Sequence, residues 1–519
     1  MKRLLLVTIS CLFLSSSLKA DEGMWLPMLV ERLNYVDMQK EGLQLTAEEL
    51  YSINSSSLKD AIVRLGPGFC TGEMISDQGL MLTNHHCGYD AIQSLSSEKD
   101  NYLDNGFWAM NKQEEKQAGF SVSFLLRMED VSSQICAELN EDMSPEERTK
   151  KIHELSDEIQ KNAVGETSNT AEVKIFYNGN EFYLFVYENF EDVRLVGAPP
   201  ESIGKFGGDT DNWMWPRHTG DFSIFRIYAN EKNEPAPYSE NNVPYKPRHY
   251  LPISLKGVGQ GDFSMVYGYP GSTNRYLSSA GIKYELDIRQ PTYVKLRRIA
   301  LDIYEEEMKK NDGIRLKYSS KHAGISNYWK YFKGQSEGLK RLEVYERKKA
   351  SELVMADWIR MDQERNKTYD SVLDGFDEGY ANLNEVKKIG LYINEAIFRI
   401  EAISYAYNFT GFKRALVENN NENLEKERED LLKNLDENFK DYDKVIDQKI
   451  FAAMIEAYSK DIPIKDQASE FKKIVANYRN DFDKMAASVY SKTLFADKEK
   501  IRSMINSPNL KKIEKDPIY

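Results

Sequence analysis

The first half of the chain consists of short apolar segments that are separated by turns. Residues 69–75 and 80–83 are apolar runs that flank a Ser-Asp-Gln-Gly turn, and this pattern predicts a β-hairpin. Residues 122–131 predict a further strand. The clearest hairpin signal is Asn178-Gly179-Asn180, because an Asn-Gly pair readily adopts the tight turns that join antiparallel strands. Its two strands are expected at 173–177 and 181–187.

Helical periodicity is scattered in the first half and dominates the second. A capping box formed by Thr46 and Glu49 predicts a short helix at 45–54, followed by another at 58–64 and a charged helix at 144–162. From Ser278 onward, long amphipathic stretches with few prolines predict a helical domain. Its helices are expected at 293–310, 337–362, 385–407 and 424–458.

Residues 1–20 have the composition of a secretory signal peptide. Lys2 and Arg3 precede an apolar run at 4–14, and Ala20 is a small residue at a suitable cleavage point. The run is too short to cross a bilayer, and no later segment is long and apolar enough. We therefore expect a secreted or periplasmic protein without a membrane span.

Charge and cysteine content narrow the classes of partner. The formal net charge is −13 at pH 7, and removal of the leader makes it more negative. Such a surface repels phosphate backbones, so nucleic-acid binding is not expected. Outside the leader, Cys70, Cys87 and Cys136 have no zinc spacing, and we expect no metal and no cofactor.

His86 is the strongest candidate for chemistry. It follows the second strand of the first hairpin and precedes Cys87, which a disulfide to Cys70 would tie back to the first strand. An imidazole held in one orientation can take a proton from a serine hydroxyl at neutral pH. The alternatives are that His85 and His86 are polar residues of a turn, or half of a metal site.

These residues resemble a known motif. Thr83-Asn84-His85-His86-Cys87 resembles the T-x-x-H-C signature of chymotrypsin-like serine peptidases, with His86 in the catalytic place. The wider runs Gly23-Met24-Trp25, GFCTGEMIS, GLMLTNHHCGYDAIQ, DNWMWPRHTGDFSIFRIYA and SNYWKYFKGQ look like the bacterial dipeptidyl-peptidase 7 and 11 family.

The resemblance implies a β-plus-α fold, a chymotrypsin-like double β-barrel with a large inserted α-helical domain. The expected parts are a signal peptide at 1–20, a peptidase domain at 21–277 and a helical lid domain at 278–519. Residues 261–271 look like an early strand of a second barrel that these residues leave incomplete.

The resemblance also implies roles for particular residues. Asp221 would orient His86, while Asn212, Trp213 and Asn327 would hold the free ammonium of an oligopeptide substrate. The alternatives are a turn-capping aspartate for Asp221 and a tryptophan-rich core corner for Trp213. The oligomeric state is open, with a homodimer as one alternative. The preference for an acidic or an apolar residue before the scissile bond is open as well.

The expected nucleophile is missing from the motifs of this chain. Ser336 lies in a G-x-S-x-G match that lacks the preceding apolar strand of a nucleophile elbow, and Ser272 follows a predicted strand as part of a turn. The family's serine is therefore expected outside these 519 residues, which would leave the chain alone inactive. The alternatives are a non-catalytic secreted peptide-binding protein, an inactive fragment, or a helical surface protein.

Overall fold

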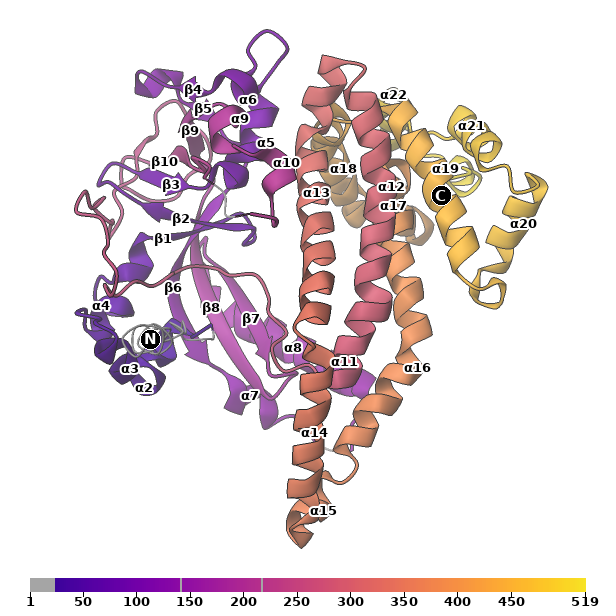
Figure 1. Cartoon of the computed structure of the whole chain (residues 1–519). Helices are drawn as coiled ribbons and strands as arrows, with labels where there is room; N and C mark the ends of the chain where they lie inside the picture. The colour runs from indigo at the N-terminus through magenta and orange to yellow at the C-terminus, as the bar shows by residue number, and fades with distance from the viewer. Residues whose placement is uncertain (1–23, 141, 216–217) are drawn as a thin grey trace, which may run out of the picture. The chain divides into compact units, whose positions relative to one another are not determined.

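The computed structural model describes residues 24–140, 142–215 and 218–519. The predicted signal peptide at 1–20 lies outside this range. The chain forms two compact units, each built from segments that are not contiguous in sequence (Figure 1). The first unit comprises the residues up to Asn84 together with Asn111–Val196 and Ile224–Gly271, and the second comprises His85–Met110, Gly197–Ser223 and Ser272–Tyr519. A division of the chain at residue 278 stays a prediction.

The first unit is built on an antiparallel sheet. Its strand order is β9-β10-β3-β2-β1-β6-β8-β7, with β5 beside β9 and β11 beside β10. The strands are β1 (Ile62–Leu65), β2 (Cys70–Met74), β3 (Leu80–Thr83), β5 (Lys116–Gln117), β6 (Val122–Asp130), β7 (Thr170–Phe176), β8 (Glu181–Phe190), β9 (Val193–Ala198), β10 (Ser223–Ala229) and β11 (Val243–Pro244). The fold is therefore mixed α and β with a large antiparallel sheet. Because this order is an open path, the double barrel stays a prediction.

The predicted hairpins are present. Strands β2 and β3 pair antiparallel across the turn at 76–79. Strands β7 and β8 pair from Thr170 opposite Tyr187 to Phe176 opposite Glu181. Asn178 and Gly179 have φ values of 57° and 91°, the left-handed conformations that an Asn-Gly turn supplies without steric penalty.

Strand β8 is buried on both faces because its side chains alternate between two apolar clusters. Phe182, Leu184 and Val186 pack with residues of α7 (Ser132–Cys136) and α8 (Pro145–Val164). Tyr183, Phe185 and Tyr187 point to the other face and pack near the N-terminal segment. The remaining helical segments of this unit are η1 (Pro27–Leu29), α2 (Val30–Leu33), α3 (Tyr35–Lys40), α4 (Ala47–Leu50), η2 (Leu58–Ala61) and η3 (Lys112–Glu114).

Two predictions for this unit are wrong. The helix expected at 58–64 is a short 3₁₀ turn, η2, followed by strand β1, whose residues pair with both β2 and β6. The strand expected at 261–271 is irregular, and Val266 within it is fully exposed. A strand is stable only when its backbone groups pair with a neighbour, and no described strand pairs with this segment.

The second unit is predominantly helical. Its helices are α5 (His85–Leu95), α6 (Tyr102–Asn105), α9 (Glu201–Gly204), α10 (Gly208–Asp211), α11 (Ser279–Tyr284), η4 (Glu285–Arg289), α12 (Gln290–Met308), α13 (Asp312–Arg341), α14 (Val344–Arg360), α15 (Gln363–Tyr369), α16 (Val372–Tyr392), η5 (Ile393–Ile397), α17 (Glu401–Glu418), α18 (Asn421–Lys440), α19 (Lys444–Asp461), η6 (Ile464–Asp466), α20 (Ser469–Asn477), α21 (Phe482–Lys492), α22 (Lys498–Asn506) and α23 (Leu510–Glu514). The two-residue strand β4 (Phe107–Trp108) pairs with Gly197 and Ala198. Helicity from Ser278 onward is thus confirmed, although the stretches expected as single helices at 337–362, 385–407 and 424–458 each span more than one helix.

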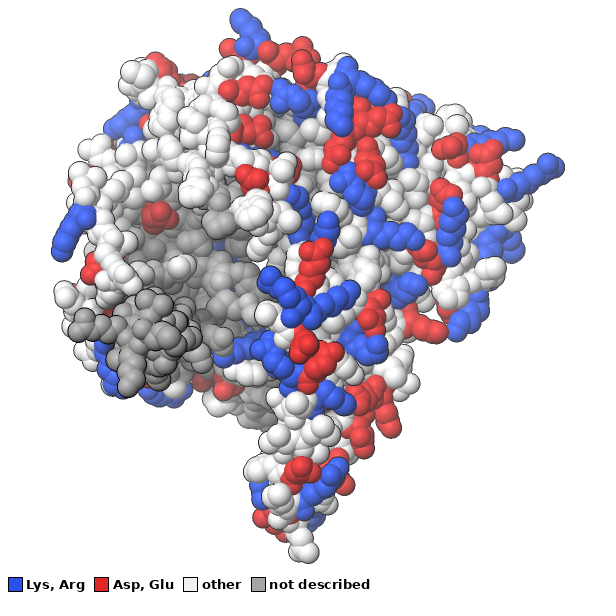
Figure 2. Space-filling view, viewed as in Figure 1, with Lys and Arg blue, Asp and Glu red and all other residues white. Residues whose placement is uncertain are grey.

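The long helices α12 and α13 lie side by side (Figure 1). Their polar faces carry basic and acidic side chains in alternation over the face seen in Figure 2. The unit's core includes Phe409, whose ring lies 5.7 Å from that of Phe412 and 5.1 Å from that of Phe495. Within the described residues, the helices are all too short or too polar to cross a membrane.

Helix α17 receives its N-terminal cap from another helix. It has no side-chain cap of its own, and the buried carboxylate of Asp447 on α19 accepts the backbone N–H groups of Glu401 at 2.7 Å and Ala402 at 3.0 Å. The Tyr490 hydroxyl donates to the same carboxylate at 2.6 Å. Burial, followed by the nearby charge of Glu401, raises the pKa of Asp447 to about 6.

Candidate active site

His86 lies at the start of a helix, directly after a strand. Strand β3 ends at Thr83 and helix α5 begins at His85, so both histidines belong to the first helical turn. The two side chains differ in environment: His85 is completely buried, whereas the side chain of His86 is 61% exposed. The exposed imidazole is the one that can meet a substrate.

Asp221 contacts His86 twice. Its Oδ2 lies 2.7 Å from His86 Nδ1, and its Oδ1 accepts the backbone N–H of His86 at 3.0 Å. The second bond satisfies an N–H group in the first turn of α5, which has no partner within the helix. One carboxylate therefore fixes both the backbone and the ring of His86. Sequence positions 86 and 221 are far apart, and the structure brings them together.

Asp221 is held in its ionised form. Burial alone would raise its pKa, but the hydrogen bonds from the ring and the backbone of His86 outweigh burial, and the pKa is lowered from its usual value. An ionised carboxylate accepts the Nδ1–H of the imidazole. This leaves Nε2 as the proton acceptor, which is the tautomer that a general base requires.

The neighbouring His85 lies close to this pair, in an environment that no sequence pattern indicates. An added Cβ at Gly204 of α9 would lie 2.3 Å from the His85 ring, so only glycine fits there. Tyr89, one turn along α5, meets the ring edge-on at 5.9 Å. Burial lowers the pKa of His85 more than the nearby Asp221 charge and the Pro199 carbonyl raise it. His85 is thus a neutral packing residue.

A second polar cluster joins Asn212, Trp213 and Asn327. Asn327 lies on α13, and its Oδ1 accepts hydrogen bonds from Asn212 Nδ2 at 2.8 Å and from Trp213 Nε1 at 2.9 Å. These contacts use the amide N–H₂ of Asn212 and leave its Oδ1 as an acceptor. The three residues that the family resemblance singled out are therefore in direct contact.

The backbone around this cluster is fastened to α13. The Lys330 ammonium donates to the Thr210 carbonyl at 2.6 Å, and the Trp213 and Tyr331 rings lie 5.2 Å apart. Trp213 has a φ of 62°, a conformation that is uncommon for a bulky residue and costs backbone energy. Its side chain is 56% exposed, so it is not the core residue of the alternative interpretation.

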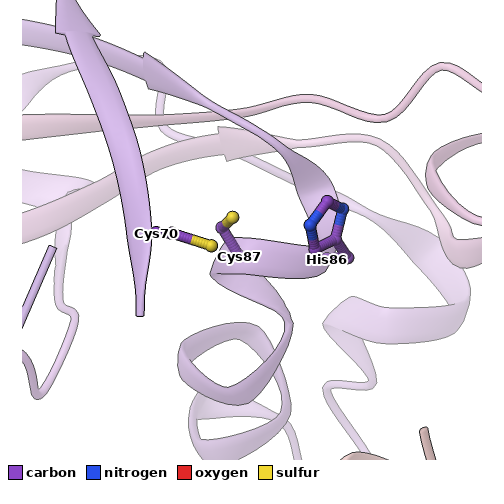
Figure 3. Close-up of side chains that lie close together, drawn as sticks. All are labelled: Cys70, His86 and Cys87. Carbon is purple, nitrogen blue, oxygen red and sulfur yellow. The ribbon is translucent and has the colours of Figure 1, made fainter. Parts of the chain in front are cut away.

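The cysteines near His86 are oxidised. Cys70 and Cys87 are both disulfide-bonded, and their sulfur atoms face each other beside the first turn of α5 in Figure 3. Potential ligand atoms of Cys70, His86 and Cys87 lie within 4.8 Å of one another. A disulfide offers no thiolate, and the thiolate is the form of cysteine that binds metals, so this group does not have the chemistry of a metal centre. Cys136 is a free, exposed cysteine.

Neither serine considered as a nucleophile has the required setting. Ser336 lies inside the continuous helix α13, where a strand-to-helix elbow cannot form. Ser272 lies in the irregular stretch before α11.

Known proteins resemble this chain along almost its whole length. The Peptidase S46 family model matches residues 20–519. The dipeptidyl-peptidase 7 of Capnocytophaga gingivalis is 40% identical over 521 residues, which cover 99% of this chain and 72% of the relative. An Asp/Glu-specific dipeptidyl-peptidase of the same organism is also 40% identical, over 93% of this chain and 67% of the relative.

A solved structure is similar throughout the chain. The crystal structure of Porphyromonas endodontalis DPP11 in complex with the dipeptide Arg-Glu aligns with a TM-score of 0.83 at 31% identity. The alignment covers 96% of this chain and 72% of that one.

Proposed function

This chain belongs to the Peptidase S46 family. From that premise we propose that the protein is a serine-type dipeptidyl peptidase, which releases dipeptides from the free N-terminus of oligopeptides. The observation that carries the proposal is the pair formed by His86 and Asp221, with 2.7 Å between Nδ1 and Oδ2. The two groups have the contact that a base and its orienting acid need in a catalytic triad.

In the proposed reaction, His86 Nε2 takes the proton of a serine hydroxyl as the serine attacks the scissile carbonyl. Asp221 stabilises the imidazolium that forms, and His86 then gives the proton to the leaving amine. Water hydrolyses the acyl-enzyme in a second step that uses the same base. The prediction that this serine lies outside these 519 residues is part of the proposal.

The amide cluster accounts for the dipeptide length. An ammonium group needs acceptors, and Asn212 Oδ1 is free to accept once Asn327 has engaged the amide N–H₂. The exposed Trp213 ring adds cation–π attraction. A substrate anchored by its amine presents the same peptide bond to His86 each time, so dipeptides are released.

We include in the proposal that the protein is exported and has the fold expected of the family, but we propose no preference for the side chain before the scissile bond. The leader-like residues 1–20 support a secreted or periplasmic location, and the resemblance to the dipeptidyl-peptidase 7 and 11 family implies a two-barrel peptidase domain with a helical lid. A dipeptidyl-peptidase 7 and an Asp/Glu-specific dipeptidyl-peptidase are both 40% identical to this chain, so similarity does not favour a preference for the residue before the scissile bond.

The test combines turnover with binding. Release of naphthylamine from dipeptidyl-naphthylamides is expected from the protein once it carries its serine, and a His86→Ala variant should lose it. N-acetylated substrates should not react. Equal rates for the parent and the His86→Ala variant would refute the assignment.

A second candidate function is peptide binding without catalysis. Two observations favour it: the amide cluster that would bind a peptide is connected, and the sequence shows no serine motif that would act on the peptide. Calorimetry on the 519-residue chain separates the two ideas when it is combined with the turnover assay. Both predict binding that requires a free amine, but only the first predicts turnover.

A further inference from the structure

The helical unit contains a cavity that the proposed peptidase chemistry does not use. Its volume is about 160 Å³, and five aromatic side chains and one carboxylate form most of its wall. These residues are Phe398, Tyr405, Phe439, Tyr442, Phe495 and Glu401. An engineered cavity of about 150 Å³ holds a benzene molecule, so the space suits a ligand of about six non-hydrogen atoms.

Three of the five rings in the wall form a connected series. The Phe439 ring lies 5.6 Å from that of Tyr405 at an interplanar angle of 83°, and 4.9 Å from that of Tyr442 at 56°. Rings that meet at steep angles expose different faces to the space between them. The face of an aromatic ring attracts a cation, and several rings around one space form the cage that recognises alkylated ammonium groups.

Carboxylates make the electrostatic environment of this wall negative. Glu401 lines the cavity, and Asp447 lies directly behind it as acceptor of the Tyr442 hydroxyl at 3.2 Å. Burial, followed by the charges of Asp447 and Glu401, raises the pKa of Tyr442. The Lys321 ammonium pairs with Glu401 at 2.7 Å and neutralises one of the two carboxylates.

A second basic group near the wall is also paired. The charge of Arg502 acts on Tyr405, whose pKa burial nevertheless raises to about 12. Arg502 itself contacts Asp436 at 2.6 Å. At neutral pH Asp447 is largely ionised, and among the described residues its carboxylate forms no ion pair, so one negative charge lies beside the rings without a paired cation.

The mouth of the cavity is polar. Asn408 and Asn438 line it and are exposed at the surface of α17 and α18. Their amide oxygens can accept a hydrogen bond from a polar end of a ligand whose cationic end lies among the rings. We propose that this cavity is a binding site for a small organic cation, an alkylated ammonium compound with a polar end.

The test compares a cation with its neutral isostere. Choline and 3,3-dimethyl-1-butanol have nearly the same shape, but a carbon replaces the charged nitrogen in the second. Calorimetry and thermal unfolding of the 519-residue chain should show saturable choline binding, with a rise in Tm that follows the choline concentration. Choline should bind at least about tenfold more tightly than the alcohol. Equal affinity for the two, or no binding of choline, would overturn the proposal.

Two variants of wall residues test whether choline binds in this cavity. Glu401→Gln removes the lining carboxylate at constant shape and leaves the Lys321 ammonium without its ion pair, whereas Phe439→Leu removes the ring that joins two others. Each variant should weaken choline binding about tenfold. Because Glu401 also contacts Lys321, Phe439→Leu keeps the test decisive if the first variant is unstable. Asn327→Ala is the control, because Trp213 is another exposed ring that attracts cations. Choline binding that survives both wall substitutions, or that is lost in Asn327→Ala, would place the cation elsewhere and refute the proposal.

Discussion

Replacing Asn327 by alanine should weaken the binding of peptides with a free N-terminus. The substitution removes the oxygen that accepts from both Asn212 Nδ2 and Trp213 Nε1, at 2.8 and 2.9 Å. Without this anchor, the Asn212 amide can rotate, and its Oδ1 no longer has a fixed direction. The amine of the peptide then loses an oriented acceptor.

The size of the effect follows from the two bonds. Each hydrogen bond contributes roughly 0.5–1.5 kcal/mol net. Trp213 is 56% exposed, so water replaces part of the bond to its indole. We therefore expect a loss of about 1–2 kcal/mol, which raises the Kd about 5- to 30-fold.

The assay is calorimetry with a tripeptide and its N-acetylated form, in a His86→Ala background so that no peptide is consumed. Asn327→Asp keeps the accepting oxygen and should bind the free-amine peptide at least as well as the parent. Glu337→Ala changes an exposed residue of the same helix and serves as the matched control. A Kd in Asn327→Ala that equals that of the control would refute the reasoning.

Three further predictions concern the folded state and the base. Asp447→Asn removes a carboxyl whose pKa is about 6 when folded and 3.8 otherwise. The difference in free energy of unfolding between parent and variant should be largest below about pH 4 and should shrink by about 3 kcal/mol as the pH rises through 6. Urea unfolding measures it, and a difference that does not change with pH would contradict the prediction. Asp221→Asn should lower kcat/KM about 10³- to 10⁴-fold in the active protein, since His86 loses its orienting carboxylate. The pKa of Asp221 is lowered in the folded state, so the parent loses stability as the pH falls below about 4, and this variant should lose less. Unchanged turnover in the variant would exclude the orienting role. Finally, a non-reducing digest should yield a peptide that links Cys70 to Cys87, and reduction should lower Tm, because a loop of this size gains about 3 kcal/mol from its crosslink; two separate peptides would exclude the pairing.

Local patterns predicted the elements that depend on local chemistry. The turn at Asn178 and Gly179 was identified because its backbone conformation is a property of those two residues. The helical character after Ser278 is predictable because the apolar spacing there is regular, whereas the ends of the individual helices are not. The strand Ile62–Leu65 is not predictable from local patterns, since its conformation depends on strands β2 and β6 on either side.

The site could be predicted only in part. The contact of His86 with Asp221 is predictable only from the family resemblance, because no local pattern links residues so far apart in sequence. The capping of α17 by Asp447 had no sequence signal at all, since the capping residue lies on a different helix. The same holds for the cavity bounded by Glu401 and Phe439, which exists only when several helices pack together.

The contact between Gly204 and His85 limits how this protein can evolve. A methyl group at position 204 would lie 2.3 Å from a fully buried ring, and that ring belongs to the residue next to His86. Even the mildest replacement would push on the helical turn that carries the base. Among natural descendants and in saturation libraries, position 204 should therefore remain glycine.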